Sequence, residues 1–198
     1  MVGKALYHGE VFTQGSRIVL VLAGRPERAF TDYQERLFAL LDALKVVWMY
    51  VGDEVLPLRA AEEGFYALYP DMYTMADFVL YPSGWEGFGN QLLEAFAAGL
   101  PVVVFEYPVF KEDIAPKGVR VISLGDTVLA ETDPAGLVRV SAEVLTHAAQ
   151  EMVTLLTDQR ERENITDHNI AVGKRYFSFD VLRSHLSEAV RWASAFAA

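Results

Sequence analysis

Hydrophobic residues along the chain fall into short continuous runs and into stripes with helical spacing. The continuous runs lie at residues 18–23, 46–51, 77–81, 102–105 and 119–124. Runs of this length between turn residues are typical of strands buried on both faces of a parallel sheet. After the first run, Leu37, Leu40, Leu41 and Leu44 lie on one face of a helix. This order predicts an α/β fold, a Rossmann-like three-layer domain with a mainly parallel sheet and helices on both faces.

The remaining segments complete this domain. One or two brief helices are expected around residues 58–76. From residue 136 to residue 198 the pattern is helical, with a last helix near 179–196, and we expect this closing segment to belong to the same domain. Residues 1–15 are predicted to form an irregular segment before the first strand, with one extra strand expected around residues 10–13. The chain, residues 1–198, is therefore predicted to form a single domain.

Composition and charge limit the possible partners. The chain has 198 residues, of which 52% are hydrophobic and 12% aromatic, as expected for a globular core. A net charge of −10 without a cluster of Lys or Arg argues against binding to nucleic acid or to an anionic membrane. The absence of cysteine excludes disulfides and thiolate sites. No apolar run reaches the ~18 to 20 residues of a transmembrane segment, and no signal peptide follows Met1, so we expect a cytoplasmic protein.

The candidate chemistry lies in residues 85–101, WEGFGNQLLEAFAAGLP. This stretch follows a predicted strand, and open parallel sheets bind ligands at the carboxyl ends of their strands. Glycines keep the loop open, and the helix from about Asn90 to Ala98 begins with unpaired N–H groups and a positive dipole end. Gly99 and Pro101 end this helix. The arrangement predicts an anion site, most naturally for phosphate.

Two acids flank this predicted site. Glu86 lies in the loop, and Glu94 lies about one turn into the helix, with its side chain leaning back towards the start. Both could flank a ligand that carries a diphosphate between two hydroxyl-rich groups, as a sugar nucleotide does. An alternative stays open at this point, because an acid near a helix start and a glycine loop can serve only the helix and the turn.

The stretch also resembles the signature of the family 4 retaining glycosyltransferases, also called group 1 glycosyl transferases. The matching residues are Tyr81-Pro82-Ser83, Glu86-Gly87-Phe88-Gly89, Leu93-Glu94-Ala95, Ala97, Gly99 and Pro101-Val102-Val103. Two glutamates separated by seven residues are the hallmark of that family. The resemblance implies the carboxyl-terminal half of the two-domain GT-B fold. It also implies a domain that binds a nucleoside-diphosphate sugar, whose hexose is transferred to an unknown acceptor with retained configuration.

The resemblance implies roles for individual residues. Glu86 would contact the hexose, Glu94 would hold the ribose hydroxyls, and Arg25 would neutralise the diphosphate, so Glu86 and Arg25 are the candidate catalytic residues. The candidate residues for binding the sugar donor are Glu94, Gly87, Phe88, Gly89, Asn90 and Arg28. Arg28 stands near the place where the family usually has a lysine. No metal and no other cofactor is expected.

Other departures from the family pattern leave questions open. Glu106, Glu112 and Asp113 follow the run at 102–105, and any of them could meet the sugar. A complete enzyme of the family is roughly twice as long, and its amino-terminal domain binds the acceptor. We therefore expect this chain to be inactive or weak alone, as a piece of a larger transferase or a lone domain with a partner. A non-catalytic nucleotide- or phosphate-binding module is the alternative, and a nucleotide-sugar epimerase of related fold is a further one.

Overall fold

The computed structural model describes residues 17–24, 31–52, 55–56, 67–130 and 136–196. The strand expected around 10–13, together with Arg25 and Arg28, lies outside these residues. In chain order the elements are β1 (Leu20–Leu22), α2 (Thr31–Ala43), β2 (Trp48–Tyr50), β3 (Val55–Leu56), β4 (Ala67–Leu68), α3 (Tyr69–Met75), β5 (Val79–Tyr81), α4 (Asn90–Ala97), β6 (Val102–Val104), η2 (Phe110–Ile114), η3 (Ala115–Lys117), β7 (Ile122–Ser123), α5 (Ala142–Thr157), α6 (Gln159–Phe177) and α7 (Phe179–Phe196).

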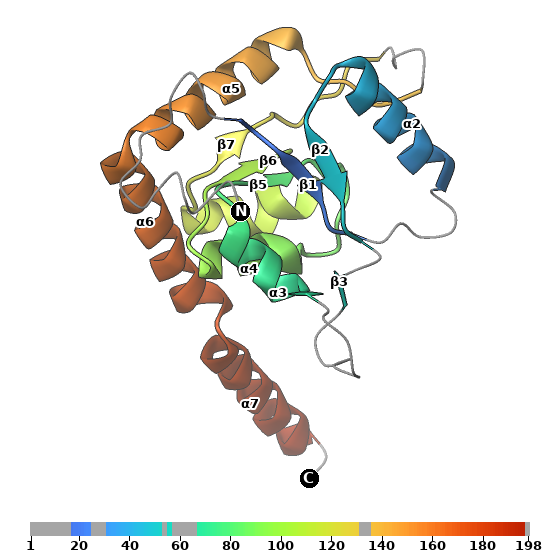
Figure 1. The fold of residues 1–198 in the computed structure, drawn as a ribbon. Coiled ribbons are helices and arrows are strands. Elements are labelled where there is room, and N and C mark those ends of the chain that lie inside the picture. The colour runs from blue at the N-terminus through green and yellow to red at the C-terminus, as the bar shows by residue number, and fades with distance from the viewer. Residues whose placement is uncertain (1–16, 25–30, 53–54, 57–66, 131–135, 197–198) are drawn as a thin grey trace.

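All strand pairs in the described residues are parallel, and helices cover both sides of the strands, so the predicted α/β class is confirmed (Figure 1). The strands form three hydrogen-bonded groups, with the orders β1-β2, β3-β4 and β5-β6-β7, and not the single sheet that we expected. In the largest group Leu80 of β5 pairs with Val103 of β6, and Val103 pairs with Ile122 of β7. The pair β3-β4 was not predicted: β4 lies in the segment 58–76, where we expected only brief helices, and α3 is the helix that the described residues of this segment contain.

Strand β6 is buried on both faces, which explains its continuous apolar run. Val102 and Val104 face a cluster that includes Leu92 and Phe96 of α4, and all four side chains are at most 1% exposed. The intervening Val103 points to the other face, as alternation along a strand requires. That face packs against α5 in a second cluster of Val103, Ile122, Ala148 and Leu155. Side-chain burial on this scale contributes about 1.5 to 3 kcal/mol for each large apolar residue, and it fixes α4 against the sheet.

Helix α4 ends where the sequence predicts. Gly99 adopts a left-handed conformation with φ of 69°. Its N–H donates to the carbonyl of Phe96 at 3.1 Å, and the N–H of Leu100 donates to the carbonyl of Ala95 at 3.1 Å. This pair of bonds is the Schellman motif, which satisfies the last carbonyls of a helix. The chain then turns directly into β6.

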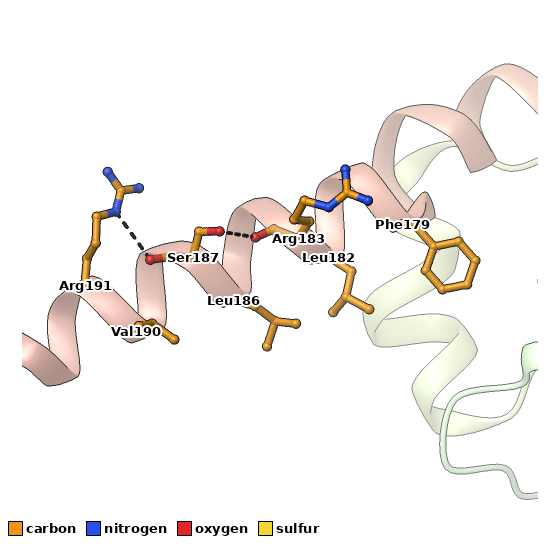
Figure 2. Close-up of a pocket in the computed structure, with 7 residues that line it drawn as sticks. All are labelled: Phe179, Leu182, Arg183, Leu186, Ser187, Val190 and Arg191. Atoms are coloured by element: carbon orange, nitrogen blue, oxygen red, sulfur yellow. Dashed lines mark hydrogen bonds between the residues drawn. The ribbon is translucent and has the colours of Figure 1, made fainter.

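The closing segment is helical, as predicted. Helix α5 is capped by the hydroxyl of Ser141, and α6 is capped by the carboxylate of Asp158, each of which accepts a backbone N–H of the first turn. Helix α7 extends away from the rest of the chain (Figure 1). Figure 2 shows its side chains Phe179, Leu182 and Leu186 on the side opposite the arginines; the ring of Phe179 is 83% exposed. Among the described residues, no helix has both the length and the apolarity to cross a membrane.

One buried polar side chain joins α6 to the sheet. Asn169 is 0% exposed, and its amide nitrogen donates to the carbonyl of Arg120 at 2.7 Å. Its amide oxygen accepts the N–H of the same Arg120 at 2.8 Å. Arg120 lies two residues before β7, so Asn169 pairs with the backbone there as a neighbouring strand would.

Candidate functional site

The loop of residues 82–89 joins the carboxyl end of β5 to the first residue of α4. Gly89 caps the helix in a left-handed conformation, with φ of 93° and ψ of 59°. Its carbonyl accepts the N–H groups of Leu92 and Leu93 at 3.1 and 3.4 Å. Within the part of the chain that the structure describes, the amides of Gly89, Asn90 and Gln91 donate no hydrogen bond. A left-handed residue followed by helical residues directs such amides to one side, where they can bind an anion.

Glu94 is exposed and is held by a tyrosine from α3. The hydroxyl of Tyr73 donates to Oε2 of Glu94 at 2.9 Å and also lies 3.3 Å from the carbonyl of Gln91. Burial raises the pKa of Tyr73 well above its ordinary value, and the hydrogen bond and the charge of Glu94 raise it further. Tyr73 therefore stays protonated and donates to this carboxylate at any physiological pH.

Glu86 is half-buried in the loop, and it acts on two further tyrosines. Burial raises the pKa of Tyr81 well above its ordinary value, and the negative charge of Glu86 adds to the shift. The same two causes raise the pKa of Tyr107 to about 12. The hydroxyl of Tyr81 also lies 3.5 Å from Oε1 of Gln91, a long contact. Tyr73 and Tyr81 thus both approach Gln91, between the two glutamates.

Tyr107 lies three residues after the end of β6, and its side chain contacts the loop that precedes α4. Its hydroxyl donates to the carbonyl of Phe88 at 2.9 Å. A Cβ atom added at Gly89 would collide with this hydroxyl, so the contact leaves no room for a side chain there. From the sequence, Tyr81 is part of the family signature, and Tyr73 belongs to an aromatic group that is more often core than a platform for a nucleotide base. The sequence alone assigns no role to Tyr107. Their positions in α3, at the end of β5 and just after β6 are the signal that could have drawn attention to them.

The three acidic residues after β6 differ in burial and in hydrogen bonding. Glu106 is half-buried, and its Oε1 accepts the hydroxyl of Ser123 at 2.6 Å, at the adjacent carboxyl ends of β6 and β7. Glu112 and Asp113 are exposed in η2. Of these three acids, Glu106 is therefore the one that the strands hold in place.

The predicted site residues that the structure describes share one segment. Gly87 and Asn90 are exposed, and the ring of Phe88 is 38% exposed and meets the ring of Phe177 edge-on at 5.9 Å. Arg25 and Arg28 lie outside the described residues, so the cationic part of the predicted site has no geometry here. In the described ranges, no group of three His, Asp or Glu side chains is arranged to hold a metal ion.

Comparison with known proteins connects this segment to a family. Residues 66–164, half of the chain, match the sequence model of the family described as glycosyl transferases group 1. A mannosylglucosylglycerate synthase of Thermotoga maritima is 39% identical over 185 residues, which cover 93% of this chain and 40% of the relative. A mannosylglucosylglycerate synthase of Petrotoga mobilis is 37% identical over 186 residues, which cover 92% of this chain and 41% of the relative. The chain thus spans about two fifths of the length of these curated relatives.

Proposed function

Because this chain belongs to the group 1 glycosyl transferases, we propose that it is the domain that binds the sugar donor in a retaining hexosyltransferase. In this proposal a hexose passes from a nucleoside-diphosphate sugar to an acceptor with its anomeric configuration kept. The domain corresponds to the carboxyl-terminal half of a GT-B fold. A further domain supplies the acceptor site, in accord with the fraction of the relatives that the chain covers.

The arrangement at the start of α4 is the observation that supports this proposal most strongly. Three backbone amides, those of residues 89–91, have no partner in the described part of the chain. In the sequence they stand between two glutamates, the half-buried Glu86 and the exposed Glu94. Amides at a helix start favour phosphate oxygens, while carboxylates accept hydroxyl groups. A diphosphate between a ribose and a hexose offers these groups in the matching order.

The proposal gives each residue a distinct task. Glu94, whose Oε2 is held by Tyr73, accepts the ribose hydroxyls with its remaining lone pairs. Glu86 contacts the hexose. Gly89 and Asn90 bind the diphosphate through their amides. Arg25 and Arg28 neutralise the charge that develops on the leaving diphosphate, and stabilisation of this kind usually supplies the largest catalytic term.

The relatives suggest a more specific reaction. Both are named mannosylglucosylglycerate synthase, and a product of that name carries a mannosyl unit on glucosylglycerate. We propose on this ground that the transferred hexose is mannose and that the acceptor is glucosylglycerate. In this proposal the transfer requires no metal. A measurement of transfer activity in the presence of EDTA tests this point.

Binding of the sugar donor is testable with the chain itself. Isothermal titration with UDP, GDP and ADP should find one nucleoside diphosphate that binds the wild type. Glu94→Ala should weaken that binding by at least about tenfold, because a charge-assisted hydrogen bond is lost. Glu112→Ala, which removes an exposed acid from η2, serves as the matched control and should bind as the wild type does. Equal binding by wild type and Glu94→Ala would contradict the role given to Glu94.

A non-catalytic nucleotide-binding module is the second candidate, since the chain covers about two fifths of its relatives. The two candidate functions predict different results for a protein that joins this chain to an acceptor domain. There Glu86→Gln should lower turnover by about 100-fold while nucleotide affinity stays within a factor of a few. A protein that binds nucleotide but shows no transfer, with or without the substitution, favours the binding module. The anomeric configuration of the product, read by NMR, tests retention.

A further inference from the structure

Tyr107 connects the hydrophobic core to the glycine loop. Its side chain is 0% exposed, and its ring packs against Tyr81 and Phe110 at centroid distances of 6.0 and 5.9 Å. Only the hydroxyl reaches a polar group of the loop, the carbonyl of Phe88 at 2.9 Å. The position of this hydroxyl is fixed, because the ring is part of the core around β6.

The bond from Tyr107 determines the direction of a peptide group. The structure contains no cis peptide bond among the described residues, and in a planar trans peptide the C=O and the N–H point in opposite directions. A carbonyl of Phe88 turned towards Tyr107 therefore turns the N–H of the buried Gly89 to the side opposite the Tyr107 hydroxyl. The next peptide is fixed from the other side, since the carbonyl of Gly89 accepts hydrogen bonds from within α4. The N–H of Asn90 thus points out of the helix start.

Without the hydroxyl, this orientation would lose its support. Gly89 populates positive and negative φ with similar ease, so the peptide between Phe88 and Gly89 can rotate at little cost. The rotated peptide would present the Phe88 carbonyl where the Gly89 amide now lies. An oxygen in that place repels a phosphate oxygen, whereas an amide attracts it.

We propose that Tyr107 is a positioning residue for the sugar donor, because its hydroxyl holds the Phe88 carbonyl and thereby aims the Gly89 amide at the diphosphate. The proposal rests on the function proposed above and adds a residue outside the family signature. Tyr107 itself touches no substrate. Its effect should therefore depend on the phosphate groups of the ligand and not on the nucleoside.

Tyr107→Phe tests this, since it keeps the buried ring and removes the hydroxyl. Titration with the nucleoside diphosphate that binds the wild type best should show an affinity lowered by about tenfold, the value of one charge-assisted hydrogen bond. Binding of the nucleoside without phosphates should change by less than about twofold. Tyr176→Phe, in a partly buried tyrosine of α6, is the matched control and should leave both affinities unchanged.

The results separate this proposal from the one on which it rests. If wild type binds no nucleoside diphosphate, the proposed function fails and this proposal fails with it. If wild type binds and Tyr107→Phe binds the diphosphate equally well, or loses nucleoside affinity to the same extent, the positioning role alone is overturned. NMR of the wild type with isotope-labelled glycine gives a second measurement if the variant does not fold. The amide signal of Gly89 should move downfield with the nucleoside diphosphate and not with the nucleoside, and a stationary signal would overturn the proposal.

Discussion

Gly89→Ala should be much more damaging than the same change at a second glycine with a similar backbone. Gly89 has φ of +93°, and an added Cβ would meet the Tyr107 hydroxyl below contact distance. Gly118 has φ of +86°, but no atom lies within 4 Å of its added Cβ. Both changes force alanine into a left-handed conformation, which costs about 1 to 2 kcal/mol. Only Gly89→Ala adds overpacking against a buried group, about 1 to 3 kcal/mol more.

Urea denaturation followed by circular dichroism measures this difference. We expect a loss of unfolding free energy of roughly 2 to 5 kcal/mol for Gly89→Ala and roughly 1 to 2 kcal/mol for Gly118→Ala. In a Tyr107→Phe background the colliding oxygen is absent, so the cost of Gly89→Ala should fall towards that of Gly118→Ala. It should stay somewhat higher, because the added Cβ still lies 3.3 Å from the Tyr81 hydroxyl and 3.4 Å from Cζ of residue 107. If Gly89→Ala costs the same in both backgrounds, the collision with the hydroxyl is not the cause and this explanation is refuted.

Three further outcomes are expected. Asn169→Ala should lower the free energy of unfolding by about 1 to 3 kcal/mol, because the part-buried N–H and C=O of Arg120 lose their partner. The exposed neighbour Asp167→Ala should change it by less than about 0.5 kcal/mol. The contribution of Tyr107 to the free energy of unfolding should be fully present below pH 10 and should be lost as the pH rises towards 12, by up to roughly 2 kcal/mol. The pKa of Tyr107 is raised from 10.0 to about 12 in the folded protein, so this tyrosine ionises first in the unfolded chain. Urea titrations between pH 9 and pH 12 should therefore show a shallower decline for Tyr107→Phe than for the wild type. Glu94→Gln should lower the pKa of Tyr73 towards its ordinary value, since an acceptor charge is removed, and ultraviolet titration of the tyrosines should show one group that ionises earlier than in the wild type.

The parts of the fold that follow from local sequence were predictable. Continuous apolar runs identified β5 and β6, since both faces of β6 are buried, and Gly99 identified the end of α4. The pair β3-β4 was missed because β4 lies directly before α3, in a segment whose hydrophobic residues have near-helical spacing. The division of the strands into three groups was also missed, since hydrogen bonding between strands depends on their relative placement and not on the pattern of either strand.

The same contrast holds for the candidate site. Glu86, Glu94 and the glycines lie in one continuous stretch, so spacing and a known signature were enough to single them out. Tyr73 and Tyr107 reach that stretch from 13 residues before Glu86 and 18 residues after Gly89, and each has a large hydrophobic ring that resembles any other core residue in the sequence. Only the direction of their hydroxyls distinguishes them, and that direction is a property of the packed fold.

The pairing between Asn169 and Arg120 bears on the behaviour of the protein at high concentration. Among the strands that the structure describes, β7 lies at one edge of its sheet, and an edge with free backbone groups can recruit the edge of another molecule. A side-chain amide occupies the backbone N–H and C=O just before this strand, where a foreign strand would begin to pair. Loss of that amide would therefore cost colloidal stability as well as folding stability, and growth of aggregates would start at β7.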